Sequence, residues 1–261
     1  MEILDKDMPE QTHLPLPPLD LRRAVSPITE ESFYDNPTAE YIWGPLDIPP
    51  LVTGEAYRKI FDFGCGCGRE ARRLLGQKNQ PEMYVGLDIN AEMIKWCQEN
   101  LQNDRFKFYH HDVWSASYAA GNTRNRFLPI EHLGSDFTVI EASSVFTHLY
   151  ADQSEFYLGQ MRNMLSPKGI IRTTWVFFNK KAFPTMGDGQ NTLFYDEGDP
   201  SIGVYYAWSF FIDMIHRLGY RLIKTEWAYA VGLHNVMYLG LSKDFADLSD
   251  VNPPGSSVVG F

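Results

Sequence analysis

Short apolar runs alternate with amphipathic stretches along the middle of the chain. Five runs have the length of buried strands, and they lie at 59–63, 83–88, 106–112, 136–142 and 169–178. The stretches between them have helical spacing, first over 70–75 and then after Asn90, which is a favourable N-cap residue. A third helix is predicted before the fifth run, with Asp152 and Glu155 at capping-box spacing and an end at 166–169. This alternation predicts an α/β fold, a parallel sheet with helices on both faces.

The segments on either side of this region have a different character. Residues 1–57 are rich in proline, which predicts an N-terminal arm or lid with one short helix around 30–34. After the fifth run comes a long insertion, 178–208, and loops of that length tend to be functional. The pattern then predicts a helix over 206–218, strands at 221–227 and 235–241, and a disordered tail over 245–261. The main domain is therefore expected to span 58–244.

Composition and charge narrow the class of protein. The net charge is −10 over 261 residues, which argues against a nucleic-acid partner because such proteins usually carry a basic face. The three cysteines form no disulfide framework, and the acidic start of the chain has no apolar segment of a secretory signal. No apolar run has the length of a membrane span. These features predict a cytoplasmic protein with no membrane or nucleic-acid partner, and they leave the oligomeric state open.

The first apolar run ends in an unusual turn, Asp62-Phe-Gly-Cys-Gly-Cys-Gly68. Glycines at this point let the backbone adopt positive φ and approach a ligand at a helix N-terminus. A dinucleotide-binding turn has the spacing G-x-G-x-x-G, and here Arg69 stands where its third glycine would be. Cys65 and Cys67 lack the two further ligands of a zinc site, so we expect no metal.

The turn resembles the first motif of class I S-adenosylmethionine-dependent methyltransferases, acidic-x-G-x-G-x-G. Further matches follow in order: Asp88 closes the second run, Asp112 follows the third, and EASSVFTHL (141–149) and MLSPKGIIRTTW (164–175) flank the fourth and fifth. The set is most similar to bacterial small-molecule and sugar-type members. The resemblance implies a Rossmann-like, doubly wound, mostly parallel seven-stranded sheet whose last strand is antiparallel.

The same resemblance implies the cofactor, S-adenosyl-L-methionine, and its contacts. Asp88 is expected at the ribose hydroxyls and Asp112 near the adenine amino group, with Ile89 and Val113 on the two faces of the adenine. Arg69 either pairs with the methionine carboxylate or reaches solvent. The full set expected to bind the cofactor is Asp62, Gly64, Cys65, Gly66, Gly68, Arg69, Asp88, Ile89, Asp112, Val113 and Glu141.

The acceptor side is less specific. His148 follows the fourth run, where an acceptor meets the methyl group, and a neutral imidazole can take a proton from a hydroxyl. A helix-start histidine bonded to nearby backbone explains it as well. Aromatic residues of the insertion and the arm are expected either to form an acceptor pocket or to pin the loop in a small hydrophobic cluster; those assigned to the pocket are Tyr41, Trp43, Phe178, Tyr205 and Tyr206.

The acceptor itself is expected to be a small molecule. The motif that methyltransferases of nucleic-acid amines carry after the fourth strand is absent, since that place reads EASS (141–144). We therefore expect O-methylation of a sugar or secondary-metabolite hydroxyl. Two other functions stay open: a nicotinamide-dependent oxidoreductase, and a methyltransferase-like binding protein without turnover.

Overall fold

The computed structural model describes residues 14–25, 29–30, 41–115, 118, 125–196, 198–230, 234–255 and 258–259. Five parallel strands form the centre of its sheet: β1 (Lys59–Phe63), β2 (Met83–Asp88), β3 (Phe106–His110), β4 (Phe137–Ala142) and β5 (Leu165–Phe178). Their order is β3-β2-β1-β4-β5, so the chain reverses its direction of travel at β1 and β4. Ligands of such sheets bind at the carboxyl ends of the strands beside that reversal.

Two further strands complete the predicted arrangement. β9 (His234–Gly240) pairs antiparallel with β5, and β8 (Arg221–Ala230) pairs antiparallel with β9. The Rossmann-like, mostly parallel sheet with an antiparallel last strand is therefore confirmed.

The number of strands differs from the expected seven, since the described residues contain ten. β5 runs on beyond the main sheet, and its last three residues pair with β7 (Val204–Ala207). β6 (Thr192–Phe194) and β10 (Val258–Val259) join this extension, β6 through β7 and β10 through β5. The insertion is thus not an unstructured loop, because the long β5 gives it an edge on which to form strands.

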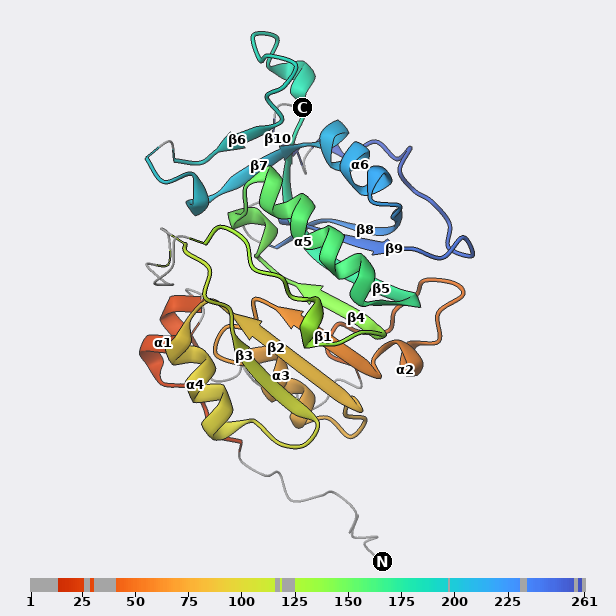
Figure 1. Cartoon of the computed structure of the whole chain (residues 1–261). Coiled ribbons are helices and arrows are strands. Elements are labelled where there is room, and N and C mark those ends of the chain that lie inside the picture. Colours follow the sequence, from red (N-terminus) through yellow and green to blue (C-terminus); the bar gives the residue numbers. More distant parts are fainter. Residues whose placement is uncertain are drawn as a thin grey trace, which may run out of the picture.

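Helices cover both faces of the sheet (Figure 1). On one face α3 (Arg69–Leu75) and α4 (Ala91–Asn100) bury apolar side chains against Ile60 and Tyr84. On the other, α5 (Ala151–Met164) packs against Phe63, and α6 (Trp208–Arg217) packs against Trp175 and Phe177 of β5 in the same core. The alternating side chains of β1 therefore supply both hydrophobic cores, as expected for a strand that is buried on both faces. In the described residues no helix has the length and apolar character needed to span a membrane.

The helix ends differ from the prediction in three places. The side chain of Gln153 accepts a hydrogen bond from the N–H of Tyr150 (3.0 Å), so α5 is capped at Tyr150 and not by the pair Asp152 and Glu155. Residues 166–169 belong to β5, because a side chain at Gly169 would lie 2.6 Å from the carbonyl of Phe137 and its absence lets the two strands pass. The last helix starts at Trp208, since 205–207 pair with β5.

The structure describes parts of the arm and of the tail. α1 (Leu19–Val25) and the short α2 (Thr53–Ala56) lie in the arm, and the helix expected around 30–34 falls almost wholly outside the described residues. Disorder was predicted for the tail over 245–261, and the structure describes 245–255 and 258–259 of it. Phe245 is buried against Gly240, and β10 pairs with β5. The remaining short turns are 3-10 helices at 131–133, 146–148, 180–182 and 200–202.

Candidate functional site

The turn after β1 is built from glycines in the left-handed region. Gly64, Gly66 and Gly68 have φ of +88°, +54° and +76°. Any other residue would be strained there. The N–H groups of Gly64 and Cys65 both donate to the carbonyl of Leu87 (2.7 and 3.0 Å), which fixes the turn to the end of β2. A side chain at Gly64 would also lie 2.4 Å from Val145, so the turn after β4 comes close only because glycine is present.

Asp88, the last residue of β2, connects this turn to α4. Its Oδ2 accepts from the N–H of Gly66 (2.8 Å) and its Oδ1 from the N–H of Asn90 (2.8 Å). Asn90 in turn caps α4, as predicted, by accepting from the N–H groups of its first turn. Burial raises the pKa of the Asp88 carboxyl, and the backbone donors work in the opposite direction. Each carboxylate oxygen keeps a second lone pair, which a vicinal diol can use.

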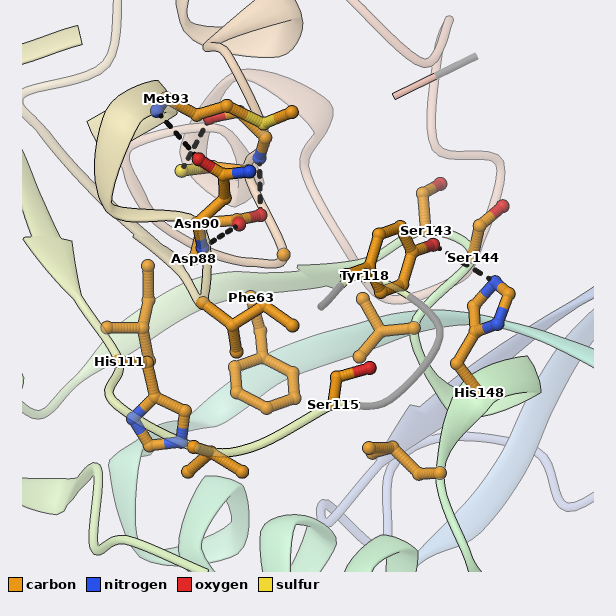
Figure 2. Close-up of a pocket in the computed structure, with 18 of the residues that line it drawn as sticks. Phe63, Asp88, Asn90, Met93, His111, Ser115, Tyr118, Ser143, Ser144 and His148 are labelled. Atoms are coloured by element: carbon orange, nitrogen blue, oxygen red, sulfur yellow. Dashed lines mark hydrogen bonds between the residues drawn. The ribbon is translucent and has the colours of Figure 1, made fainter. Parts of the chain in front are cut away.

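A cavity of about 460 Å³ opens at this edge of the sheet. Its volume lies in the range of about 300–1,000 Å³ that small-molecule sites occupy. The cavity brings together most of the residues predicted to bind a cofactor or to catalyse, namely Asp62, Gly64, Cys65, Gly66, Arg69, Asp88, Ile89, Val113 and His148. Figure 2 shows Asp88 and His148 toward opposite ends of the cavity, with the ring of Phe63 between them.

Three residues predicted to bind the cofactor do not line the cavity. Gly68 faces α4, where a side chain would meet Leu101 at 2.7 Å. Glu141 is fully buried and forms an ion pair with Arg172 (2.7 Å). Its carboxylate therefore links β4 to β5. Asp112 follows β3 and is half-buried outside the lining.

Two acidic side chains that flank the glycine turn, Asp62 and Glu70, have different surroundings. Asp62 is buried, accepts a hydrogen bond from the hydroxyl of Tyr84, and has a pKa raised well above its usual range by burial. Glu70, on the first turn of α3, also lines the cavity. Its Oε1 accepts from Arg69 Nε (2.8 Å), whereas its buried Oε2 has no hydrogen-bond partner among the described residues. An unpaired carboxylate oxygen at a cavity wall is suited to a cationic ligand group.

Part of the arm lies against the glycine turn. Ala24 and Val25, at the end of α1, line the cavity, and a side chain at Gly66 would lie 3.0 Å from Val25. Arg72 of α3 holds the arm by donating to the carbonyls of Pro15 (3.1 Å) and Leu14 (2.8 Å). Figure 1 shows α1 beside α4, where Leu21 packs near Met93. The described arm therefore lies against the glycine turn, at the end of the cavity where the cofactor is predicted to bind.

His148 has a defined tautomer. Its Nδ1 lies 2.8 Å from the carbonyl oxygen of Ser201, which only accepts, so Nδ1 carries the proton. Nε2 is then an acceptor, and the Tyr118 hydroxyl lies 3.3 Å from it (Figure 2). Burial lowers the pKa of His148, and the Ser201 carbonyl and Asp199 partly offset this effect. The ring is therefore neutral near pH 7, with an unprotonated nitrogen facing the cavity.

The aromatic residues predicted to bind the acceptor do not line this cavity. Tyr41 and Trp43 stack on Tyr57 in the core on the α3 side. Phe178 is buried, and Tyr206 is buried with its hydroxyl donated to the carbonyl of Leu149 (2.6 Å). Tyr205 lines a separate, smaller cavity. Most of these residues therefore fit the alternative interpretation, in which the aromatic rings hold the loop in place in a hydrophobic cluster.

Several residues that line the cavity were not predicted from the sequence. His111 is one of them, and it lies in the cavity wall with its Nε2 2.8 Å from the Tyr157 hydroxyl. Phe63 and His111 carry a recognisable signal, since both stand at the carboxyl ends of parallel strands. The others come from elements whose proximity the sequence does not reveal, chiefly Val25, Glu70, Tyr118, Arg126, Ser143, Ser144, Tyr150 and Ser201. No group of three metal-ligating side chains occurs within the described ranges.

The donor set fits S-adenosylmethionine. Glu70 Oε2 is an orphaned acceptor for an ammonium group, and Arg69 stands beside it for a carboxylate. Asp88 offers two oxygens to a ribose, and the apolar side chains of Ile89 and Val113 follow for an adenine. A nicotinamide dinucleotide would instead need close backbone approach for a pyrophosphate, and Arg69 begins the helix at that point.

Comparisons with known proteins agree with this site. Residues 61–171, from β1 into β5, match a family described as a methyltransferase domain. A complex from Haloferax volcanii of the Trm112 methyltransferase activator with a protein assigned as a methyltransferase is 12% identical, with a TM-score of 0.50 over 75% of this chain and 86% of that chain. An S-adenosylmethionine-dependent methyltransferase of Leishmania major is 14% identical, with a TM-score of 0.49 over 72% of this chain. This chain spans only 66% of that protein.

A third solved structure is the magnesium protoporphyrin IX methyltransferase of Synechocystis PCC 6803 with bound S-adenosylhomocysteine. It is 11% identical, with a TM-score of 0.47 over 71% of this chain and 75% of that chain. At such identities the structural likeness supports the fold alone. The family match adds that residues 61–171 resemble a methyltransferase domain, which agrees with the predicted enzyme class and with S-adenosylmethionine as its cofactor.

Proposed function

We propose that this chain transfers the methyl group of S-adenosylmethionine to a hydroxyl oxygen of a small molecule, with His148 as general base. The observation that carries the proposal is the tautomer of His148. The Ser201 carbonyl holds the proton on Nδ1, which leaves Nε2 as an acceptor in the cavity wall. A neutral imidazole in this position suits a hydroxyl acceptor, which must lose a proton as it is methylated.

The cofactor half of the site is assigned to the residues around the glycine turn. Asp88 is proposed to accept from the ribose hydroxyls, Glu70 to accept from the amino group and Arg69 to donate to the carboxylate. When bound, the cofactor supplies an electrophilic methyl group and takes back the electron pair of its carbon–sulfur bond. The chain's own contribution is to hold the acceptor oxygen in line and to move its proton to Nε2.

A small acceptor is favoured over a nucleic acid by the charge of the chain. The net charge is −10, and cationic side chains are needed to neutralise a phosphate backbone. The finer resemblance, to small-molecule and sugar-type members, stays a prediction.

The experiment uses S-adenosylmethionine with a deuterated methyl group, incubated with the protein and a metabolite extract. Mass spectrometry is expected to find a labelled methyl group on a hydroxylated metabolite. His148→Ala should lower the rate by roughly 10²–10⁴-fold, whereas His132→Ala, at an exposed histidine outside the site, should not.

Three outcomes would contradict the proposal. Cofactor binding without any labelled product would identify a binding protein without turnover. A label found on nitrogen or carbon would exclude the hydroxyl acceptor. A fluorescence change on titration with reduced nicotinamide cofactor, together with no binding of S-adenosylmethionine, would favour an oxidoreductase.

A further inference from the structure

A second cavity, of about 240 Å³, adjoins the cofactor cavity at His148. Among the described residues, His148 is the one that lines both. The second cavity is formed where β5 extends beyond the main sheet: Val176 comes from β5, Val204 and Tyr205 from β7, and His234 from the start of β9. These strands do not contribute to the cofactor cavity in the described residues. The second cavity is therefore a compartment separate from the cofactor cavity, and residues of the insertion 178–208 form part of its wall.

Thr147 provides a polar group in the wall of this compartment. The residue is 3% exposed, and its Oγ1 is buried without a hydrogen-bond partner among the described residues. Buried hydroxyl groups are nearly always paired, because leaving one unpaired costs free energy. A group of this kind at a cavity wall is suited to a polar atom of a ligand. Thr147 and His148, neighbours in the chain, both line this compartment.

The compartment carries no formal charge in its described lining. Its titratable groups are His148, His234, Tyr195 and Tyr205, and no Asp, Glu, Lys or Arg of the described chain lines it. Burial lowers the pKa of both histidines, and the neighbouring His148 lowers that of His234 further. Ser144 Oγ, in the wall of the cofactor cavity, lies 3.4 Å from His234 Nδ1. An ionised carboxylate or phosphate would find no counter-charge here, whereas an uncharged ligand would lose little on entering.

We propose that this second cavity is the acceptor site and that it takes an uncharged, hydroxyl-bearing ring of single-ring size. This rests on the proposed function. The ring packs against Val176 and Val204, a polar atom of the ring meets Thr147 Oγ1, and the hydroxyl to be methylated lies at His148. The hydroxyl proton passes to His148 Nε2 as the oxygen forms its bond to the methyl carbon, and the carbon–sulfur electron pair stays on the sulfur. The imidazolium then returns the proton to solvent.

The test is ligand-observed NMR on the full chain saturated with S-adenosylhomocysteine. The probes are phenol, methyl glucopyranoside and benzoate, which separate an aromatic from a sugar ring and a neutral from an anionic ring. We expect one of the two neutral probes to bind and benzoate to bind at least tenfold more weakly. Tight binding of benzoate, or no binding of either neutral probe, would overturn the inference.

Two variants test the residues. Thr147→Val should weaken the binding of the neutral probe about fivefold while thermal stability stays the same or rises, because the variant removes an unpaired buried hydroxyl. Ile202→Trp, at a 44% exposed position in the cavity wall, should block the probe. Val251→Trp is the matched control, since Val251 is 38% exposed and lies outside the lining. Unchanged binding in both wall variants would place the ring elsewhere.

Calorimetry with S-adenosylhomocysteine on the same samples separates the two proposals. If the wild type binds S-adenosylhomocysteine but none of the neutral rings, the acceptor site is wrong and the cofactor assignment stands. If it binds no S-adenosylhomocysteine, the proposed function itself fails.

Discussion

Asp88 has two tasks at the residue scale. Its carboxylate accepts from the N–H groups of Gly66 and Asn90, so it holds the glycine turn and the start of α4 in place, and Asp88 also lines the cavity. A side chain that orders a turn and is also proposed to contact a ligand is hard to replace, because an amide or an apolar group loses one function or both.

Asp88→Ala is therefore expected to weaken the binding of S-adenosylhomocysteine by more than about tenfold, or roughly 1.4 kcal/mol. The binding of 5′-methylthioadenosine, which keeps the ribose and lacks the amino-acid part, should fall by a similar factor. Calorimetry measures both, with Asp104→Ala, at an exposed aspartate outside the site, as control. An unchanged affinity would remove Asp88 from the ribose site.

A change at Glu70 is expected to affect the two ligands unequally, in contrast to Asp88→Ala. Its unpaired Oε2 is assigned to the amino group of the cofactor, so Glu70→Gln should weaken S-adenosylhomocysteine about tenfold. 5′-Methylthioadenosine has no amino group, and its affinity should change less than twofold. Equal losses for the two ligands would show that Glu70 acts through the fold of α3 and not by contact with the ligand.

At the scale of elements, the arm and α3 form one unit around the cofactor end. Arg72 points from α3 to the carbonyls of Leu14 and Pro15, and α1 then runs over the glycine turn. No residue of α1 is fully buried, so its position depends on a few contacts. An element held in this way opens at low free-energy cost.

Arg72→Met keeps much of the side-chain stem and removes the donors. We expect faster proteolysis within the arm and an affinity for S-adenosylhomocysteine that is lower by about tenfold, since hydrogen bonds to charged groups are worth roughly 1.5–3 kcal/mol. Arg58→Met is the control, because Arg58 is exposed and pairs only with Glu82 among the described residues. Slow proteolysis together with full affinity in Arg72→Met would contradict the role of the arm.

At the scale of the whole molecule, buried neutral histidines couple stability to pH. His111 is 6% exposed, bonds Tyr157, and has a pKa lowered to about 4 by burial. The unfolded chain binds this proton near pH 6.5, so between pH 6.5 and 4 the unfolded state holds more protons than the folded state. The contribution to stability is complete above pH 6.5 and is lost as pH falls toward 4, by up to about 3 kcal/mol.

His111→Gln keeps a hydrogen-bonding group and removes the titration. Its free energy of unfolding, measured with denaturant, should fall less steeply between pH 6.5 and 4 than that of the wild type. His132→Gln, at an exposed histidine, should follow the wild type. His148 and His234 also have lowered pKa values and act in the same direction, so part of the acid loss will persist in His111→Gln.

The helices and strands that were predicted correctly depend on patterns that are local in the sequence. The strands β1 to β4 and the cap at Asn90 follow from apolar runs and a side chain that bonds its own helix. Residues 166–169 were misread because their helix-ending signal is local, whereas Gly169 is required by the backbone of Phe137 on another strand. The ion pair of Glu141 could not be predicted for a similar reason, because its partner Arg172 lies on β5.

The sequence by itself determined the glycine turn and the carboxylate at the end of β2. Glycines that tolerate positive φ and a carboxylate at the end of the next strand are adjacent in the chain or one crossover apart, and parallel strands bring their carboxyl ends to one edge. The tertiary structure decided the rest. The arm over the turn, the tautomer of His148 set by Ser201, and the second cavity all join segments that are far apart in the sequence, and only packing fixes such contacts.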